Sequence, residues 1–167
     1  MTGSKERLPE RQRRTAARLA AVQSLYQMSI TGIPAPRVIA EFKELRLAGG
    51  DENESFGPAD PAFYERLTAG VTSDLETVDR LIEGALSEDW AIDRLETIVR
   101  NILECGAHEL LTHGDVPAAV VISEYVDVAH GFFSDKEPGF INGVLDRIAR
   151  TLREGEKGAV PSDTESE

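Results

Sequence analysis

The sequence predicts an all-α protein, a bundle of six to seven helices. Apolar residues recur every three or four positions along most of the 167-residue chain, which is the period of a helix with one buried face. No segment shows the sustained two-residue alternation and hairpin turns that a sheet requires. Gly and Pro interrupt the helical pattern at intervals that separate one helix from the next. At 41% apolar residues, the chain can bury a core of its own.

A first amphipathic helix is expected over residues 10–30, because its apolar side chains share one broad face (Leu19, Val22, Leu25, Tyr26 and Ile30). Gly32 and Pro34 should end it. A short second helix carries Val38 and Phe42 and is expected to stop before Gly49-Gly50. Residues 48–60 combine turn formers and acids without a period, which predicts a surface loop.

The next two helices each begin at a recognisable signal. Asp60-Pro61 reads as an N-cap and first helical residue, and the apolar pattern continues from there to Leu81. Asp93 and Glu96 have the spacing of a capping box before another apolar run. That helix is expected to stop at Gly114.

Two prolines open the last two helices, Pro117 and Pro138, and the final apolar stripe runs to Leu152. We therefore divide the chain into a flexible N-terminus (1–9), a helical domain (10–153) and a disordered acidic tail (154–167). The Gly- and Pro-containing loop suggests subdomains of about 10–60 and 61–153.

The charge of the chain is unevenly distributed. Residues 1–46 contain nine Lys/Arg and four Asp/Glu and carry +5, whereas the whole chain carries −12, so the remainder carries −17. A basic end on an acidic body favours contact with a polyanion such as nucleic acid. A solvated helix face is the alternative interpretation of the same charges.

Arginines gather in the first helix. Arg11, Arg14 and Arg18 fall within about 60° of one another on a wheel of 3.6 residues per turn, while Arg13 points elsewhere. A guanidinium can bind phosphate through two hydrogen bonds or stack on a base. Single-strand recognition also needs stacking groups beside such cations.

The last helix offers candidates for such stacking groups. Its apolar stripe leaves Phe140 on the flank and turns Asn142 outward, while Gly139 and Gly143 leave a strip of bare backbone. A helix that merely tolerates small residues explains the pattern equally well.

Five segments together resemble the NusB family of bacterial transcription antitermination factors. They are 14–27 (RTAARLAAVQSLYQ), 67–71 (LTAGV), 102–111 (ILECGAHELL), 115–117 (DVP) and 140–146 (FINGVLD). The resemblance covers about residues 10–153 and implies a helical fold of two small bundles. It also implies a non-enzymatic protein that binds the boxA element of nascent ribosomal RNA transcripts with NusE, a small-subunit ribosomal protein, in the RNA polymerase antitermination complex.

The resemblance implies RNA-binding residues at both ends of the chain. Tyr26 has a competing interpretation as a core residue beside Leu19 and Val22. The expected RNA-binding set is Arg11, Arg13, Arg14, Arg18, Gln23, Tyr26, Phe140 and Asn142.

Other chemistry has little support. Cys105 and His108 lie three residues apart on one helix but have no second ligand pair, so we expect neither a metal nor another cofactor. No nucleophile elbow or phosphate-binding loop motif is present, so we expect no enzyme activity. The longest apolar run, residues 116–122, is far too short for a membrane span. With one cysteine and no signal peptide pattern, a cytoplasmic location is expected.

Two other functions fit the same residues. A related helical module accompanies ribosomal RNA cytosine methyltransferases, so the chain could be an accessory RNA-binding domain. The arginines could instead pair with acidic helices of a second copy and make a homodimeric interaction module.

Overall fold

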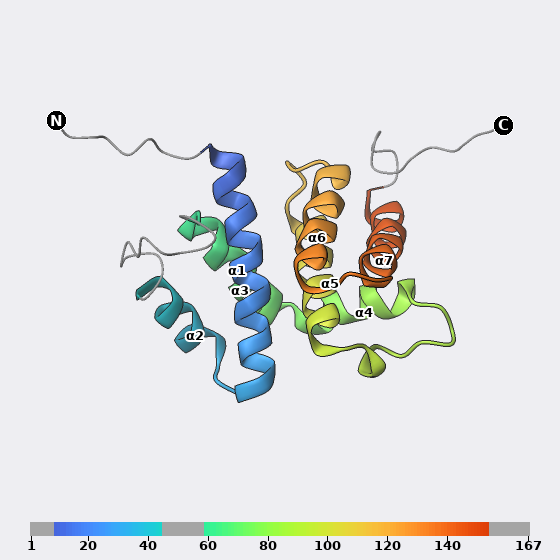
Figure 1. Ribbon diagram of the computed structural model, residues 1–167, viewed down its shortest axis with the longest axis horizontal. Coiled ribbons are helices and arrows are strands. Elements are labelled where there is room, and N and C mark those ends of the chain that lie inside the picture. Colours follow the sequence, from blue (N-terminus) through green and yellow to red (C-terminus); the bar gives the residue numbers. More distant parts are fainter. Residues whose placement is uncertain (1–8, 45–58, 154–167) are drawn as a thin grey trace.

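The computed structural model describes residues 9–44 and 59–153, and the prediction of an all-α fold is confirmed. Figure 1 shows the arrangement of the helices. Within the described residues they are α1 (Glu10–Thr31), α2 (Ala35–Phe42), α3 (Pro61–Ser73), α4 (Leu75–Ala85), the 3₁₀ helix η2 (Ile92–Arg94), α5 (Thr97–Thr112), α6 (Ala118–Phe132) and α7 (Glu137–Leu152).

The helices form two groups that meet along α1 and α5. In Figure 1, α1, α2 and α3 lie on one side and α4 to α7 on the other. Helix α3 packs on both α1 and α2, whereas α5 contacts α1, α3, α4, α6 and α7. The packing therefore favours a boundary between the groups at the end of α3, near Asp74, instead of the boundary expected near residue 60.

The end of α1 and the start of α3 have the capping residues expected from the sequence. Gly32 adopts a left-handed conformation (φ 77°) and its N–H donates to the carbonyl of Met28 at 2.9 Å, the αL cap that glycine adopts without strain. Asp60 caps α3, because its Oδ1 accepts a hydrogen bond from the backbone N–H of Phe63 at 3.1 Å.

Two expected helix boundaries are wrong. The helix expected to run from Pro61 through Leu81 breaks at Asp74 (φ −105°, ψ 23°) into α3 and α4. The Asp74 carboxylate lies 3.3 Å from His108 Nε2 on α5, a tertiary contact that the helical period does not encode. The Asp93/Glu96 capping box does not form, since residues 92–94 make a 3₁₀ turn and α5 begins at Thr97 with no side-chain cap.

Helix α5 is the centre of the core. Every residue from 101 to 110 is buried, as expected for a helix surrounded by five others. Gly106 permits the close approach of α7 and α6, because a Cβ there would lie 2.9 Å from both Cδ atoms of Leu145 and 3.4 Å from Tyr125. Cys105 and His108 are buried on the same helix.

None of the helices in residues 9–44 and 59–153 combines the length and apolar content that a bilayer span requires. The flexible N-terminus and acidic tail expected from the sequence lie outside the described residues except for Pro9. The same holds for the loop 48–60 except for Ala59 and Asp60.

Gly106→Ala should lower the free energy of unfolding by about 1–3 kcal/mol, because its methyl group overpacks the contact with α7. Gly84→Ala is the matched control, since a Cβ at that helical position meets nothing within 4 Å. The control should be neutral or gain up to about 1 kcal/mol through helix propensity. Urea titrations monitored by circular dichroism measure both, and equal stabilities of the two variants would contradict this packing.

Candidate nucleic-acid interface

The arginines of α1 belong to its first three turns and differ in exposure. Arg11 is exposed, Arg13 and Arg14 are half-buried, and Arg18 is buried at 2% exposure. The carbonyl of Arg13 accepts a hydrogen bond from the N–H of Asp60 at 3.0 Å. This bond holds the start of α3 against the basic segment.

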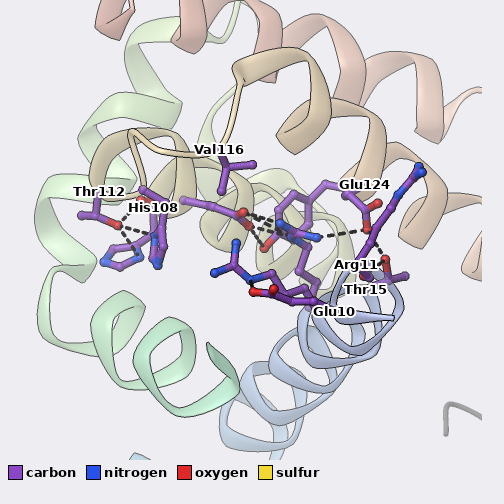
Figure 2. Close-up of polar contacts among 12 residues, drawn as sticks. Glu10, Arg11, Thr15, His108, Thr112, Val116 and Glu124 are labelled. Atoms are coloured by element: carbon purple, nitrogen blue, oxygen red, sulfur yellow. Dashed lines mark hydrogen bonds and ion pairs between the residues drawn. The ribbon is translucent and has the colours of Figure 1, made fainter. Parts of the chain in front are cut away.

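Arg18 forms a buried ion-pair network with the second group of helices. Its Nε and Nη2 donate to the Glu109 carboxylate on α5 at 2.9 and 2.6 Å, and its Nη1 lies 3.2 Å from Glu124 Oε1 on α6. The hydroxyl of Tyr125 donates to Glu109 Oε1 at 2.8 Å, and that of Thr15 donates to Glu124 Oε1 at 2.8 Å. Figure 2 shows the contact between Thr15 of α1 and Glu124 of α6.

The network changes the expected role of Arg18. Burial lowers the pKa of Arg18, but its hydrogen bond and charge pairing with Glu109 raise that pKa above the ordinary value, so the guanidinium stays charged. A cation whose donors are used inside the protein is not free to bind phosphate. Of the three guanidiniums expected along one edge of the first helix, Arg18 is therefore buried, which leaves Arg11 exposed and Arg14 half-buried.

The sequence analysis identified neither Glu109 nor Glu124 as a partner of Arg18. A signal was present in the alanines around Arg18, which predict a closely packed helix face. Ala16, Ala17, Ala20 and Ala21 are all buried.

A groove of about 610 Å³ lies between the start of α1 and the start of α6. Arg11 is exposed beside it, and Arg14 forms part of its wall with its Nε 3.7 Å from Glu10 Oε2. Val120 is 41% exposed and adds an apolar surface. The groove is lined by Glu10, Arg11, Arg14, Arg18, Val116, Ala119, Val120, Ser123 and Glu124.

This arrangement suits an extended polyanion. Arg11 and Arg14 offer donors for phosphate, and the N-terminal end of α6 adds the positive end of a helix dipole. Val120 offers an apolar surface to a base or sugar. The residues lining the groove include no His or Cys.

Gln23 and Tyr26 lie farther along α1. Gln23 is half-buried and Tyr26 is 42% exposed, so Tyr26 is not the core residue that its helical phase allowed. Twelve residues separate Tyr26 from Arg14, which is about 18 Å along a helix. Contact with RNA by these two residues stays a prediction.

Phe140 and Asn142 lie near the start of α7, away from the groove. Asn142 is exposed as expected, and Phe140 is half-buried with its ring centroid 5.8 Å from that of Trp90. Helix α7 packs antiparallel to α6, so its first turn lies at the end of α6 opposite the groove (Figure 1). The structure therefore does not bring these two residues next to Arg11 and Arg14, and their contact with RNA also stays a prediction.

Comparison with known proteins decides the family. The model of the NusB family matches residues 15–150. This chain belongs to the NusB family. Transcription antitermination protein NusB of Sinorhizobium fredii is 46% identical over 152 residues, 91% of this chain and 95% of that protein. The NusB of Nitrobacter hamburgensis is 49% identical over 144 residues, 86% of this chain and 90% of that protein.

Solved NusB structures share the fold. T. maritima NusB superposes with a TM-score of 0.70 at 28% identity, covering 87% of this chain and 93% of that one. A crystal structure of antitermination factors NusB and NusE in complex with dsRNA gives a TM-score of 0.68 at 27% identity, covering 83% of this chain and 96% of that one.

A second charged cluster in this NusB-family chain surrounds Arg100 on α5. Arg100 Nη2 lies 3.0 Å from Asp79 Oδ2, and its Nε donates to Glu104 Oε2 at 3.1 Å. The side-chain amide of Asn101 donates to Glu104 Oε1 at 3.2 Å. Burial and the neighbouring Asp79 carboxylate together raise the pKa of Glu104 to about 7, although Asn101 and Arg100 act in the opposite direction.

Arg18→Met should cost about 3–5 kcal/mol of unfolding free energy, because it leaves the buried Glu109 and Glu124 carboxylates without their cation. Glu109→Gln in the same background should restore part of the loss. Arg37→Ala, which breaks an exposed pair with Glu41, should cost less than about 1 kcal/mol. Urea denaturation measures all three, and a loss for Arg18→Met as small as that for Arg37→Ala would contradict the network.

The raised pKa of Glu104 predicts a pH dependence of stability. Between its ordinary value of 4.5 and about 7, the folded state binds a proton that the unfolded state has released. Raising the pH through this window should therefore destabilise the parent relative to Glu104→Gln, by on the order of 2–3 kcal/mol. Unfolding curves at pH 5 and pH 8 measure the difference, and the same pH dependence in both proteins would contradict it.

Proposed function

We propose that this chain is a transcription antitermination factor. It binds a boxA-type single-stranded RNA of nascent ribosomal RNA transcripts, together with NusE, in the RNA polymerase antitermination complex. The observation that carries this proposal is the groove between α1 and α6, which places Arg11 and Arg14 opposite the N-terminal end of α6. The comparisons support it, because the relatives are named antitermination proteins and a structural neighbour was solved with NusE and RNA.

Electrostatics favour this groove as the RNA contact. The chain as a whole carries −12, so most of its surface repels a polyanion. Arg11 forms no ion pair within the described residues, and the nearest carboxylate to Arg14 is Glu10 at 3.7 Å. Two cations that are only weakly paired within the protein can neutralise RNA phosphates. The counterions released from the RNA are then the main source of affinity for the RNA backbone.

The same geometry favours binding over catalysis. Of the groove's acids, Glu124 is already paired with Arg18, and Glu10 is an exposed residue of the first turn of α1. We therefore propose a non-enzymatic role. The location proposed for this role is the cytoplasm, as expected from the sequence.

The acidic body of the chain supports a basic protein partner. Residues after 46 carry −17, which attracts a basic ribosomal protein such as NusE and speeds the encounter. If both ligands bind the same folded state, the coupling must be reciprocal, so RNA and NusE each tighten the binding of the other.

The test is a fluorescence anisotropy titration of the purified chain, with and without NusE. The RNAs are a boxA-like single strand, a scrambled strand and a duplex. The parent should prefer the boxA-like strand, and NusE should raise its affinity roughly 5- to 150-fold. The double change Arg11→Ala and Arg14→Ala should weaken binding and reduce the slope of log affinity against log salt by about 1.4.

The matched control is Arg37→Ala with Arg80→Ala, which changes the net charge equally at exposed positions on α2 and α4. This control should retain nearly all of the parent's affinity. Equal losses in the two double variants would mean that only net charge matters and would contradict the groove. A chain that forms a homodimer and ignores all three RNAs would support the interaction-module alternative.

A further inference from the structure

One buried aromatic ring is surrounded by arginines from two helices. Phe63 of α3 is fully buried, and its ring centroid lies 4.7 Å from Arg14 Cζ, 5.1 Å from Arg18 Cζ and 6.0 Å from Arg66 Cζ. A ring face attracts cations by its quadrupole. The Phe63 ring therefore stabilises three guanidiniums close to one another, although their like charges repel.

Backbone bonds hold this ring in place against α1. The N–H of Asp60 donates to the carbonyl of Arg13, and the Asp60 side chain caps the N–H of Phe63. The first turn of α3 is thus fixed to the basic segment of α1. Arg66 lies one turn after Phe63 on the same helix, so its position relative to Arg14 follows from these bonds.

The three cations differ in how they are neutralised. Arg18 pairs with two buried carboxylates. Arg14 has Glu10 at 3.7 Å, beyond hydrogen-bond length, and its Nε is buried without an acceptor. Arg66 is exposed, and its side chain forms no ion pair or hydrogen bond with another described residue. Within the described residues, Arg14 therefore has only the long contact with Glu10, and Arg66 has no anionic partner.

We propose that Arg14 and Arg66 together bind one phosphate of a single-stranded RNA, at a site over Phe63 on the α1–α3 edge. This inference rests on the proposed function and deepens it. Arg14 also lines the groove between α1 and α6, so the strand continues from that groove across Arg14 onto α3. The Nε of Arg14, which has no acceptor, receives one from the phosphate, and the Arg66 guanidinium can donate two parallel N–H···O bonds to the same phosphate.

Arg66→Ala tests the site, with Arg80→Ala as the matched control, because Arg80 is an exposed arginine on the neighbouring helix α4 and changes the charge equally. Anisotropy titrations with the boxA-like strand should show a twofold to fivefold loss of affinity for Arg66→Ala. The salt slope should fall by about 0.7, the value for one phosphate contact to a single strand. Arg80→Ala should leave affinity and slope at the parent's values.

A double-mutant cycle tests whether the two arginines share one phosphate. Arg14→Gln keeps most of the side-chain stem in place, and melting curves of each variant show whether it folds like the parent. The double variant Arg14→Gln with Arg66→Ala should lose less affinity than the product of the two single losses, since either change already disrupts the shared contact. Strictly multiplicative losses would overturn the shared site.

The outcomes separate this inference from the proposed function. If the parent prefers boxA-like RNA but Arg66→Ala behaves like Arg80→Ala, the α3 site is wrong and the groove stands. If the parent shows no affinity for RNA, with or without NusE, the proposed function and this site both fall.

Discussion

The arrangement of the two helix groups depends on the buried pairing of Arg18 with Glu109 and Glu124. A buried arginine is tolerated only when carboxylates meet its charge and its donors. Glu109 and Glu124 come from α5 and α6, so the pairing sets how α1 lies against the second group. Arg11 and Arg14 precede Arg18 by one to two turns on the same helix and are therefore presented beside the start of α6.

The packing around this network makes the ion pair possible. The four buried alanines of α1 let that helix pack closely against its neighbours, because small side chains reduce the distance between helix axes. Arg153 at the end of α7 adds a second restraint, since it donates to the carbonyls of Leu110 and His113 at 3.0 and 2.8 Å and also to that of Val116. Val116 lines the groove, so α7 holds one wall of the groove in position.

Charge is used in two ways in the first turns of α1. The guanidinium of Arg18 is buried, and its ion pairs fix the position of α1 against α5 and α6. The guanidiniums of Arg11 and Arg14 lie nearer the surface. Arg18 is buried because it lies beside the buried alanines of α1 and because two carboxylates of other helices face it. An arginine-rich segment therefore contains both structural and binding residues.

Much of the fold follows from local signals. The period of the apolar residues, the glycine at position 32 and the Asp60-Pro61 pair predicted helices that the structure contains, because these depend on neighbours in sequence. Asp74, where the expected helix breaks, contacts His108 of another helix, and the buried Arg18 pairs with Glu109, 91 positions away. A helical wheel states which residues share a face but not which helix covers that face, so those features could not be predicted.

The candidate site was predicted only in part for the same reason. Arg11 and Arg14 were found because their charge is local to one helix. The groove was not, because it exists only where α6 packs beside α1. The separation of Phe140 from the arginines follows from the antiparallel course of α6 and α7, which no local pattern encodes.

The most direct test of the central claim is an NMR titration of the isotope-labelled chain with the boxA-like strand, which maps the backbone amides that respond to RNA. If the groove is the RNA contact, the largest shifts are expected in the first turns of α1 and α6, with residues 35–42 of α2 unaffected. Large shifts confined to other surfaces, with residues 10–18 and 116–124 unchanged, would contradict it.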